Sequence, residues 1–232
     1  MRQFSTSTKL VFAAVFVLLV FVSNKINFSA LVGAKNQFFT LFQFFGPIAG
    51  GILGSFVGAA VVLAASAINL LLNIATNNVA IEPLVLLRLL PMVFAAYYFG
   101  SKKRSLSLIV PIIAIALFNL HPVARQVWFY SLFWTIPIIA KFFQHRLLAR
   151  SLGATFAAHS VGGAIWVWSV PMTPEMWIAL IPVVIVERVL FAIGIAGSFI
   201  AANTMLAKVE ANVPLVAVDK RYVLSRRLLS HI

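Results

Sequence analysis

Long apolar stretches, separated by short polar segments, run through almost the whole chain. They cover residues 10–22, 38–73, 83–99, 106–120, 127–140, 152–170 and 177–206. A helix that crosses a membrane needs about 20 predominantly apolar residues. The pattern therefore predicts an all-α fold, in which residues 1–206 form one polytopic transmembrane bundle of about six to eight helices. Residues 207–232 are polar and basic, and we expect them to form a tail outside the bundle.

Region 38–73 is too long for a single crossing. As one helix it would be about 54 Å long, whereas the hydrocarbon core is about 30 Å thick. It contains Gly46-Pro47 and Gly50-Gly51, and we expect a break there because proline removes a backbone donor and glycine loosens a helix. If both arms cross the membrane, the first begins near residue 30 and takes in three polar residues: Lys35, Asn36 and Gln37.

Composition supports a lipid environment and excludes several classes of protein. Hydrophobic residues make up 62% of the chain and charged residues 10%, against about half and about a quarter in soluble domains. This excludes a cytosolic enzyme, a disordered chain and a secreted disulfide scaffold. The absence of cysteine from the sequence excludes disulfides, thiol catalysis and cysteine-bound metals.

The distribution of basic residues predicts a topology. Lys and Arg are concentrated in three basic segments, namely 100–105, 141–151 and the tail, whereas the loops between them carry only Arg125. Lys and Arg collect on the cytoplasmic side of membrane proteins. We therefore expect a multi-pass protein of the cell membrane with a cytoplasmic C-terminus, and we expect no nucleic-acid partner despite the net charge of +13. The rule leaves the side of the N-terminus open.

Two adjacent charges, Glu187 and Arg188, interrupt the last apolar stretch. Polar groups in lipid usually face the protein interior. Neighbouring residues on a helix point about 100° apart, so we expect no tight pair between them and a partner for each on another helix. Arg88 or His159 could pair with Glu187, and Glu82 with Arg188. These charges either form structural ion pairs or bind a substrate or relay protons; Arg88 could instead extend to the membrane surface.

A third polar position lies in the stretch 152–170. His159, Gly162, Gly163 and Trp166 fall at i, i+3, i+4 and i+7, on one helical face. This face is either the site of a hydrogen-bonded core histidine or a binding face, on which the tryptophan stacks on a flat ligand. Most of the other tryptophans near segment ends are expected to anchor helices at the membrane interface: Trp128, Trp134, Trp168 and Trp177.

Motifs for catalysis and nucleotide binding are absent from the sequence. It has no phosphate-binding Gly-x-x-x-x-Gly-Lys-Ser/Thr loop, no His-Glu-x-x-His and no acidic cluster for magnesium. Its sole aspartate, Asp219, lies in the tail. We therefore expect no enzymatic activity, no metal and no cofactor.

Two motifs carry a resemblance to a known family. Lys25-Ile-Asn-Phe-Ser29, an apolar run and then Phe45-Gly-Pro-Ile-Ala-Gly50 resemble the N-terminal half of the S components of energy-coupling factor (ECF) transporters. S components are compact helical membrane proteins that bind a vitamin or similar micronutrient on the outer side. They pass it on through a scaffold membrane subunit and cytoplasmic ATPases. The resemblance implies that Asn27 and Ser29 lie near the ligand, that residues 46–50 form a tight turn and that both termini are cytoplasmic.

The leading hypothesis is a membrane protein that binds and moves a small solute between helices near the outer leaflet. The expected binding residues are Asn27, Ser29, Asn36, Gln37, Gln43, Arg88, His159, Trp166, Glu187 and Arg188. The expected partners are the solute, the lipid bilayer, a scaffold membrane subunit and cytoplasmic ATPases. One alternative is a non-transporting scaffold or assembly subunit with structural ion pairs. Another is an intramembrane enzyme that acts on lipid, with His159 and Glu187 as acid and base.

Overall fold

The computed structural model describes residues 6–30, 38–77, 83–102, 105–210 and 218–224, and these are predominantly helical. The α-helices are α1 (Thr6–Ser23), α2 (Ile48–Leu53), α3 (Ser55–Asn77), α4 (Pro83–Leu87), α5 (Leu90–Gly100), α6 (Ser105–Leu120), α7 (Pro122–Gln126), α8 (Thr135–Ala140), α9 (Leu147–Ser169) and α10 (Pro174–Glu210). Short 3₁₀ helices are η1 (Leu41–Phe44), η2 (Trp128–Trp134), η3 (Lys141–Phe143) and η4 (Lys220–Tyr222). The all-α prediction is confirmed, apart from two short strands, β1 (Asn27–Ala30) and β2 (Phe38–Thr40).

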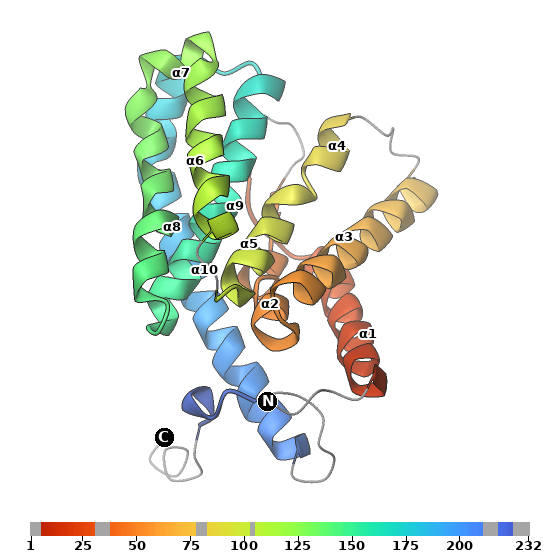
Figure 1. The fold of residues 1–232 in the computed structure, drawn as a ribbon. Helices are drawn as coiled ribbons and strands as arrows, with labels where there is room; N and C mark the ends of the chain where they lie inside the picture. The colour runs from red at the N-terminus through yellow and green to blue at the C-terminus, as the bar shows by residue number, and fades with distance from the viewer. Residues whose placement is uncertain (1–5, 31–37, 78–82, 103–104, 211–217, 225–232) are drawn as a thin grey trace.

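Within the described residues, three helical stretches are long and apolar enough to cross a membrane. They are Ser55–Thr76, Pro83–Gly100 and Pro174–Lys208, and shorter apolar helices cover Ala13–Ser23, Ser107–Leu120 and Trp128–Phe143. Helix α5 lies between α3 and α9, and α10 runs along the full height of the molecule (Figure 1). The start of α1 and the end of α10 lie toward the same end in this view.

Region 38–73 breaks at the predicted cluster, but the two arms are unequal. The chain turns at Gly46-Pro47, forms the six-residue α2, and breaks again at Gly54, whose φ of 89° favours glycine. The long α3 follows. If both arms crossed the membrane, the first would be one helix from near residue 30. This alternative is wrong, because the described residues of that arm form β2, η1 and the short α2. Lys35, Asn36 and Gln37 lie outside the described residues.

The two strands form an antiparallel pair that the sequence pattern did not predict. Asn27 pairs with Thr40 and Ser29 with Phe39, with a shift of register between Asn27 and Ser29. The Thr40 hydroxyl also donates a hydrogen bond of 2.9 Å to the side-chain oxygen of Asn24. The pair therefore ties the end of α1 to the start of η1.

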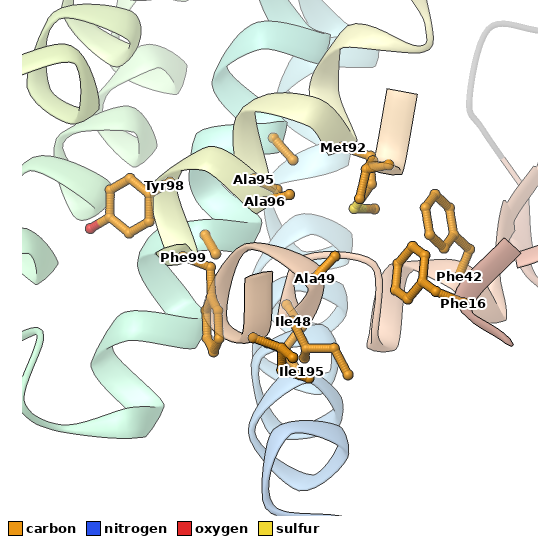
Figure 2. Close-up of a cluster of buried hydrophobic side chains, with 14 of the residues drawn as sticks. Phe16, Phe42, Ile48, Ala49, Met92, Ala95, Ala96, Tyr98, Phe99 and Ile195 are labelled. Carbon is orange, nitrogen blue, oxygen red and sulfur yellow. The ribbon is translucent and has the colours of Figure 1, made fainter. Parts of the chain in front are cut away.

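Helix α2 packs inside the fold against α5 because glycines let their backbones touch. A Cβ added at Gly50 would lie 1.8 Å from the carbonyl oxygen of Ala96, and one at Gly100 would lie 2.2 Å from the Gly50 carbonyl oxygen. Around this contact lies a buried apolar cluster drawn from α1, η1, α2, α5 and α10, which includes Phe16, Phe42, Ile48, Phe99 and Ile195 (Figure 2).

A second core is aromatic and joins α6, η2 and α9 to the start of α10. The ring centroid of Phe118 lies 5.0 Å from that of Trp134 and 5.1 Å from that of Trp177. Trp134 and Trp177 are 0% and 2% exposed, whereas Trp128 and Trp168 are 56% and 57% exposed. The prediction of an interfacial anchor is therefore wrong for the two buried tryptophans, since both fill the space between helices.

The described parts of the three basic segments meet at one end of the molecule. The buried Lys141 ammonium donates a hydrogen bond of 2.7 Å to the carbonyl oxygen of Ser101, which joins the second segment to the first. The Tyr222 hydroxyl donates to the carbonyl oxygen of His145 at 3.2 Å, which joins the tail to the second segment. We call this the basic end.

Candidate binding cavity

A cavity of about 490 Å³ lies among the strand pair, η1, α3, the α4–α5 turn, η2, α9 and α10. Pockets of about 300–1,000 Å³ are typical of small-molecule sites. Most of the predicted binding residues line it: Asn27, Gln43, Arg88, His159, Trp166, Glu187 and Arg188. Ser29 contacts it indirectly through Glu187. Asn36 and Gln37 lie outside the described residues.

Glu187 and Arg188 pair with each other, contrary to the prediction. Arg188 Nη2 lies 3.3 Å from Glu187 Oε2, and the Ser29 hydroxyl donates to Glu187 Oε1 at 2.5 Å. The guanidinium also lies 4.7 Å from the Phe39 ring centroid and 4.9 Å from that of Phe191, a cation–π geometry. The expectation failed because two long side chains bend toward each other across the 100° between neighbouring residues.

Hydrogen bonds to two aromatic residues fix the position and the tautomer of the His159 ring. The indole N–H of Trp134 donates to His159 Nδ1 at 3.2 Å, and Tyr130 Oη lies 3.2 Å from His159 Nε2. Indole can only donate, so Nδ1 carries no proton and a neutral ring carries its proton on Nε2. His159 then donates to Tyr130 Oη, and the proton of the Tyr130 hydroxyl is left to point elsewhere. Both ring nitrogens are thus used by the protein.

Arg88 lies in the turn between α4 and α5, where its backbone N–H bonds to the carbonyl oxygen of Leu84. Its side chain lines the cavity. Within the described part of the chain it has no acidic partner. The expected pairing of Glu187 with Arg88 or His159 is wrong, since Glu187 bonds to Ser29 and Arg188. Glu82, the expected partner of Arg188, lies outside the described residues.

Three buried polar atoms on the cavity residues have no hydrogen-bond partner among the described residues: Asn69 Oδ1, Trp177 Nε1 and Arg188 Nε. Leaving such an atom buried without a partner costs about 1–3 kcal/mol. A bound molecule that supplied these bonds would remove the cost. Two of these atoms are donors and one is an acceptor.

Sequence reasoning missed several polar residues of this wall: Asn24, Ser66, Asn69, Asn73, Tyr130 and Trp177. Ser66, Asn69 and Asn73 are spaced i, i+3 and i+7 on α3, and this helical periodicity could have identified them. Tyr130 and Trp177 gave no comparable signal, because their positions depend on the aromatic core.

The charged part of the cavity is far from the basic end. Twelve residues of α9, about 18 Å of helix, separate Leu147 from His159. Fifteen residues of α10, about 22 Å of helix, separate Arg188 from Asn203, whose side chain accepts a hydrogen bond from the backbone of Asp219 in the tail. The charged part of the cavity therefore lies in the half of the molecule that is remote from the basic end.

No protein-family model matches the chain, and neither does any curated protein or solved structure. These comparisons neither support nor oppose the S-component resemblance. Among the described residues, no group of three His, Asp or Glu side chains could hold a metal ion.

Proposed function

We propose that this protein is a multi-pass membrane protein that binds a small solute in the cavity, as the substrate-binding subunit of a transporter. The observation that carries the proposal is the convergence of seven predicted polar or aromatic residues, from well-separated parts of the sequence, on one cavity of about 490 Å³. A scaffold subunit does not require such a cavity, whereas a small-molecule site does.

The membrane location is supported by the outer surface. Large apolar side chains are widely exposed on α1 and α3, for example Leu18 at 66%, Phe56 at 69% and Leu71 at 62%. Apolar surface on this scale is stable in lipid and costly in water. We place the basic end in the cytoplasm, as the positive-inside rule favours, which puts the cavity in the outer half of the membrane.

The energy for transport would come from partners. The sequence has no phosphate-binding loop for ATP, so we propose that a scaffold membrane subunit and cytoplasmic ATPases couple solute release to ATP hydrolysis, as in ECF transporters. The basic end, where the ends of α5 and α10 meet the tail, would face these partners. In this arrangement the chain itself catalyses no reaction.

A thermal-shift screen of the purified protein over vitamins, amino acids and nucleobases tests the proposal. A ligand at about 100 times its Kd stabilises a protein by about 2.7 kcal/mol, which raises the unfolding midpoint by about 5–11 °C for a chain of this size. We expect at least one compound to produce such a shift and to be taken up by cells that contain the protein. No shift from any compound, with uptake unchanged in a deletion strain, would contradict the proposal.

A matched pair of glycine variants shows whether the shift comes from the cavity. Gly162 lines the cavity, and a Cβ there would meet only the Pro91 ring, at 3.6 Å. Gly162→Phe should therefore fill the cavity without disturbing the backbone and abolish the shift. Gly197, on α10, has no atom within 4 Å of an added Cβ, so Gly197→Phe is the control and should keep the shift.

A further inference from the structure

We infer that the solute is a small organic monocarboxylate with a flat apolar body, whose carboxylate is bound by Arg88 and Arg188. The inference rests on the proposed function, because it names the chemical class of the solute for the same cavity. It is carried by the charge of the cavity wall and by the donors on its residues that have no hydrogen-bond partner among the described residues.

The charges of the side chains on the described cavity wall do not sum to zero. Arg88 and Arg188 are cationic, and Glu187 is the single carboxylate that lines the cavity. His159 is neutral, since a proton on Nδ1 would oppose the N–H of Trp134. One positive charge is therefore left without a partner among these groups. Because uncompensated charge is costly in a medium of low dielectric constant, an anion of charge −1 is the ligand that balances the wall.

Two of the three unused atoms on the cavity residues are donors, which favours an acceptor on the solute. Arg188 uses Nη2 for Glu187, while its buried Nε has no partner among the described residues. The Trp177 indole N–H is a second buried donor without a partner in the described chain, and the hydroxyl proton of Tyr130 is a third. A carboxylate only accepts hydrogen bonds and forms its strongest ones with guanidinium.

A cationic or neutral solute fits the same wall less well. The carboxylate of Glu187 already accepts from Ser29 and from Arg188, so a cation would find it occupied and would lie near two arginines. A neutral solute would leave the charge of Arg88 uncompensated. The remaining wall is aromatic and aliphatic, with Trp166 and Phe39 among its residues, which suits a flat apolar body.

Matched series of small molecules test the charge preference on the purified full-length protein. Each series keeps one ring system and changes one group: benzoate, benzamide and benzylamine; phenylacetate, phenylacetamide and phenethylamine; indole-3-acetate, indole-3-acetamide and tryptamine. Thermal unfolding is measured against concentration at pH 7 and constant ionic strength. In at least one series we expect the acid to bind about tenfold or more tightly than its amide and its amine.

Three arginine variants assign the preference to the cavity. Arg88→Gln should weaken binding of the acid to the level of the amide. Arg188→Lys keeps a cation beside Glu187, so the fold is retained, but it removes the Nε–H and should weaken the acid about tenfold. The control is Arg125→Gln, because the exposed Arg125 side chain donates to the carbonyl oxygen of Leu120 and does not line the cavity. This variant should bind the acid as the unmodified protein does.

Two results would overturn the inference while the proposed function stands. One is an amide or amine that binds as tightly as its acid. The other is an acid whose affinity is the same in Arg88→Gln and Arg188→Lys as in the unmodified protein. If no acid binds at all, the inference also fails, and the broader screen with Gly162→Phe decides separately whether the cavity takes any solute.

Discussion

Replacing Glu187 with glutamine removes the negative charge from the centre of the cavity wall. The carboxylate accepts from the Ser29 hydroxyl at one oxygen and from Arg188 Nη2 at the other. The glutamine carbonyl can still accept from Ser29, so the substitution mainly leaves the guanidinium without its counter-charge. The Arg188 and Glu187 side chains are 2% and 10% exposed, so water compensates little of this loss.

The expected loss of stability is about 3 kcal/mol. Removing one partner of a buried ion pair typically costs about 3–5 kcal/mol. The 3.3 Å between Nη2 and Oε2 is longer than the roughly 2.7–2.9 Å of a strong charge-assisted bond, which favours the lower end. For a chain of this size, Glu187→Gln should lower the unfolding midpoint by about 6–12 °C.

A double-mutant cycle on the purified protein measures this effect by thermal unfolding. Glu187→Gln combined with Arg188→Met removes both charges and should recover most of the stability, because neutral replacements of a buried pair are well tolerated. Glu175→Gln, at an exposed position of the same helix, is the control and should stay within about 0.5 kcal/mol. The reasoning is refuted if Glu187→Gln unfolds at the temperature of the unmodified protein, or if the double variant is no more stable than the single one.

Three further predictions concern other parts of the fold. Tyr130→Phe should cost about 1–3 kcal/mol in thermal unfolding, because it leaves His159 Nε2–H without its acceptor. Gly50→Ala should prevent normal folding, measured as the yield of monodisperse protein, because its Cβ would lie 1.8 Å from the carbonyl oxygen of Ala96. The hydrogen bonds from the arginine two residues later lower the pKa of Asp219 below its ordinary value of 3.8. Its stabilisation of the tail is therefore present above about pH 4 and lost as the pH falls through the lowered pKa, which limited proteolysis of the tail measures.

Each of these predictions has a result that would contradict it. An unchanged midpoint for Tyr130→Phe would mean that the imidazole finds another acceptor. A normal yield of Gly50→Ala, equal to that of the open-site control Gly197→Ala, would mean that α2 and α5 do not touch. A tail that is cleaved equally fast at pH 7 and at a pH below the lowered pKa of Asp219 would mean that the carboxylate does not stabilise the tail.

The helical part of the fold could be predicted closely, since apolar stretches of membrane length have few alternative structures. Residues 106–120 were expected as a helix and form α6 (Ser105–Leu120). The strand pair could not be predicted, because strands of four and three residues show no clear alternation. The burial of Trp134 and Trp177 depends on their packing against Phe118, a contact between distant parts of the sequence that no local pattern contains.

The sequence indicated which residues line the candidate site, but it did not indicate how their side chains pair. Ionisable residues in an apolar helix have to face the interior, and this identified Arg88, His159, Glu187 and Arg188, all of which line the cavity. Their partners were predicted wrongly. The angle between two positions on a helix gives the direction in which each side chain starts, but not how far a long side chain can bend. The contribution of Tyr130 depends on the tautomer of His159, which only the three-dimensional arrangement determines.

Native mass spectrometry of the full-length protein, purified from cells grown in rich medium, tests most directly whether the cavity holds a solute. The account predicts one non-covalent adduct of defined mass, which is released on denaturation, is retained by Gly197→Phe and is lost from Gly162→Phe. The same adduct on Gly162→Phe, or no bound small molecule on any of the three proteins, would contradict it.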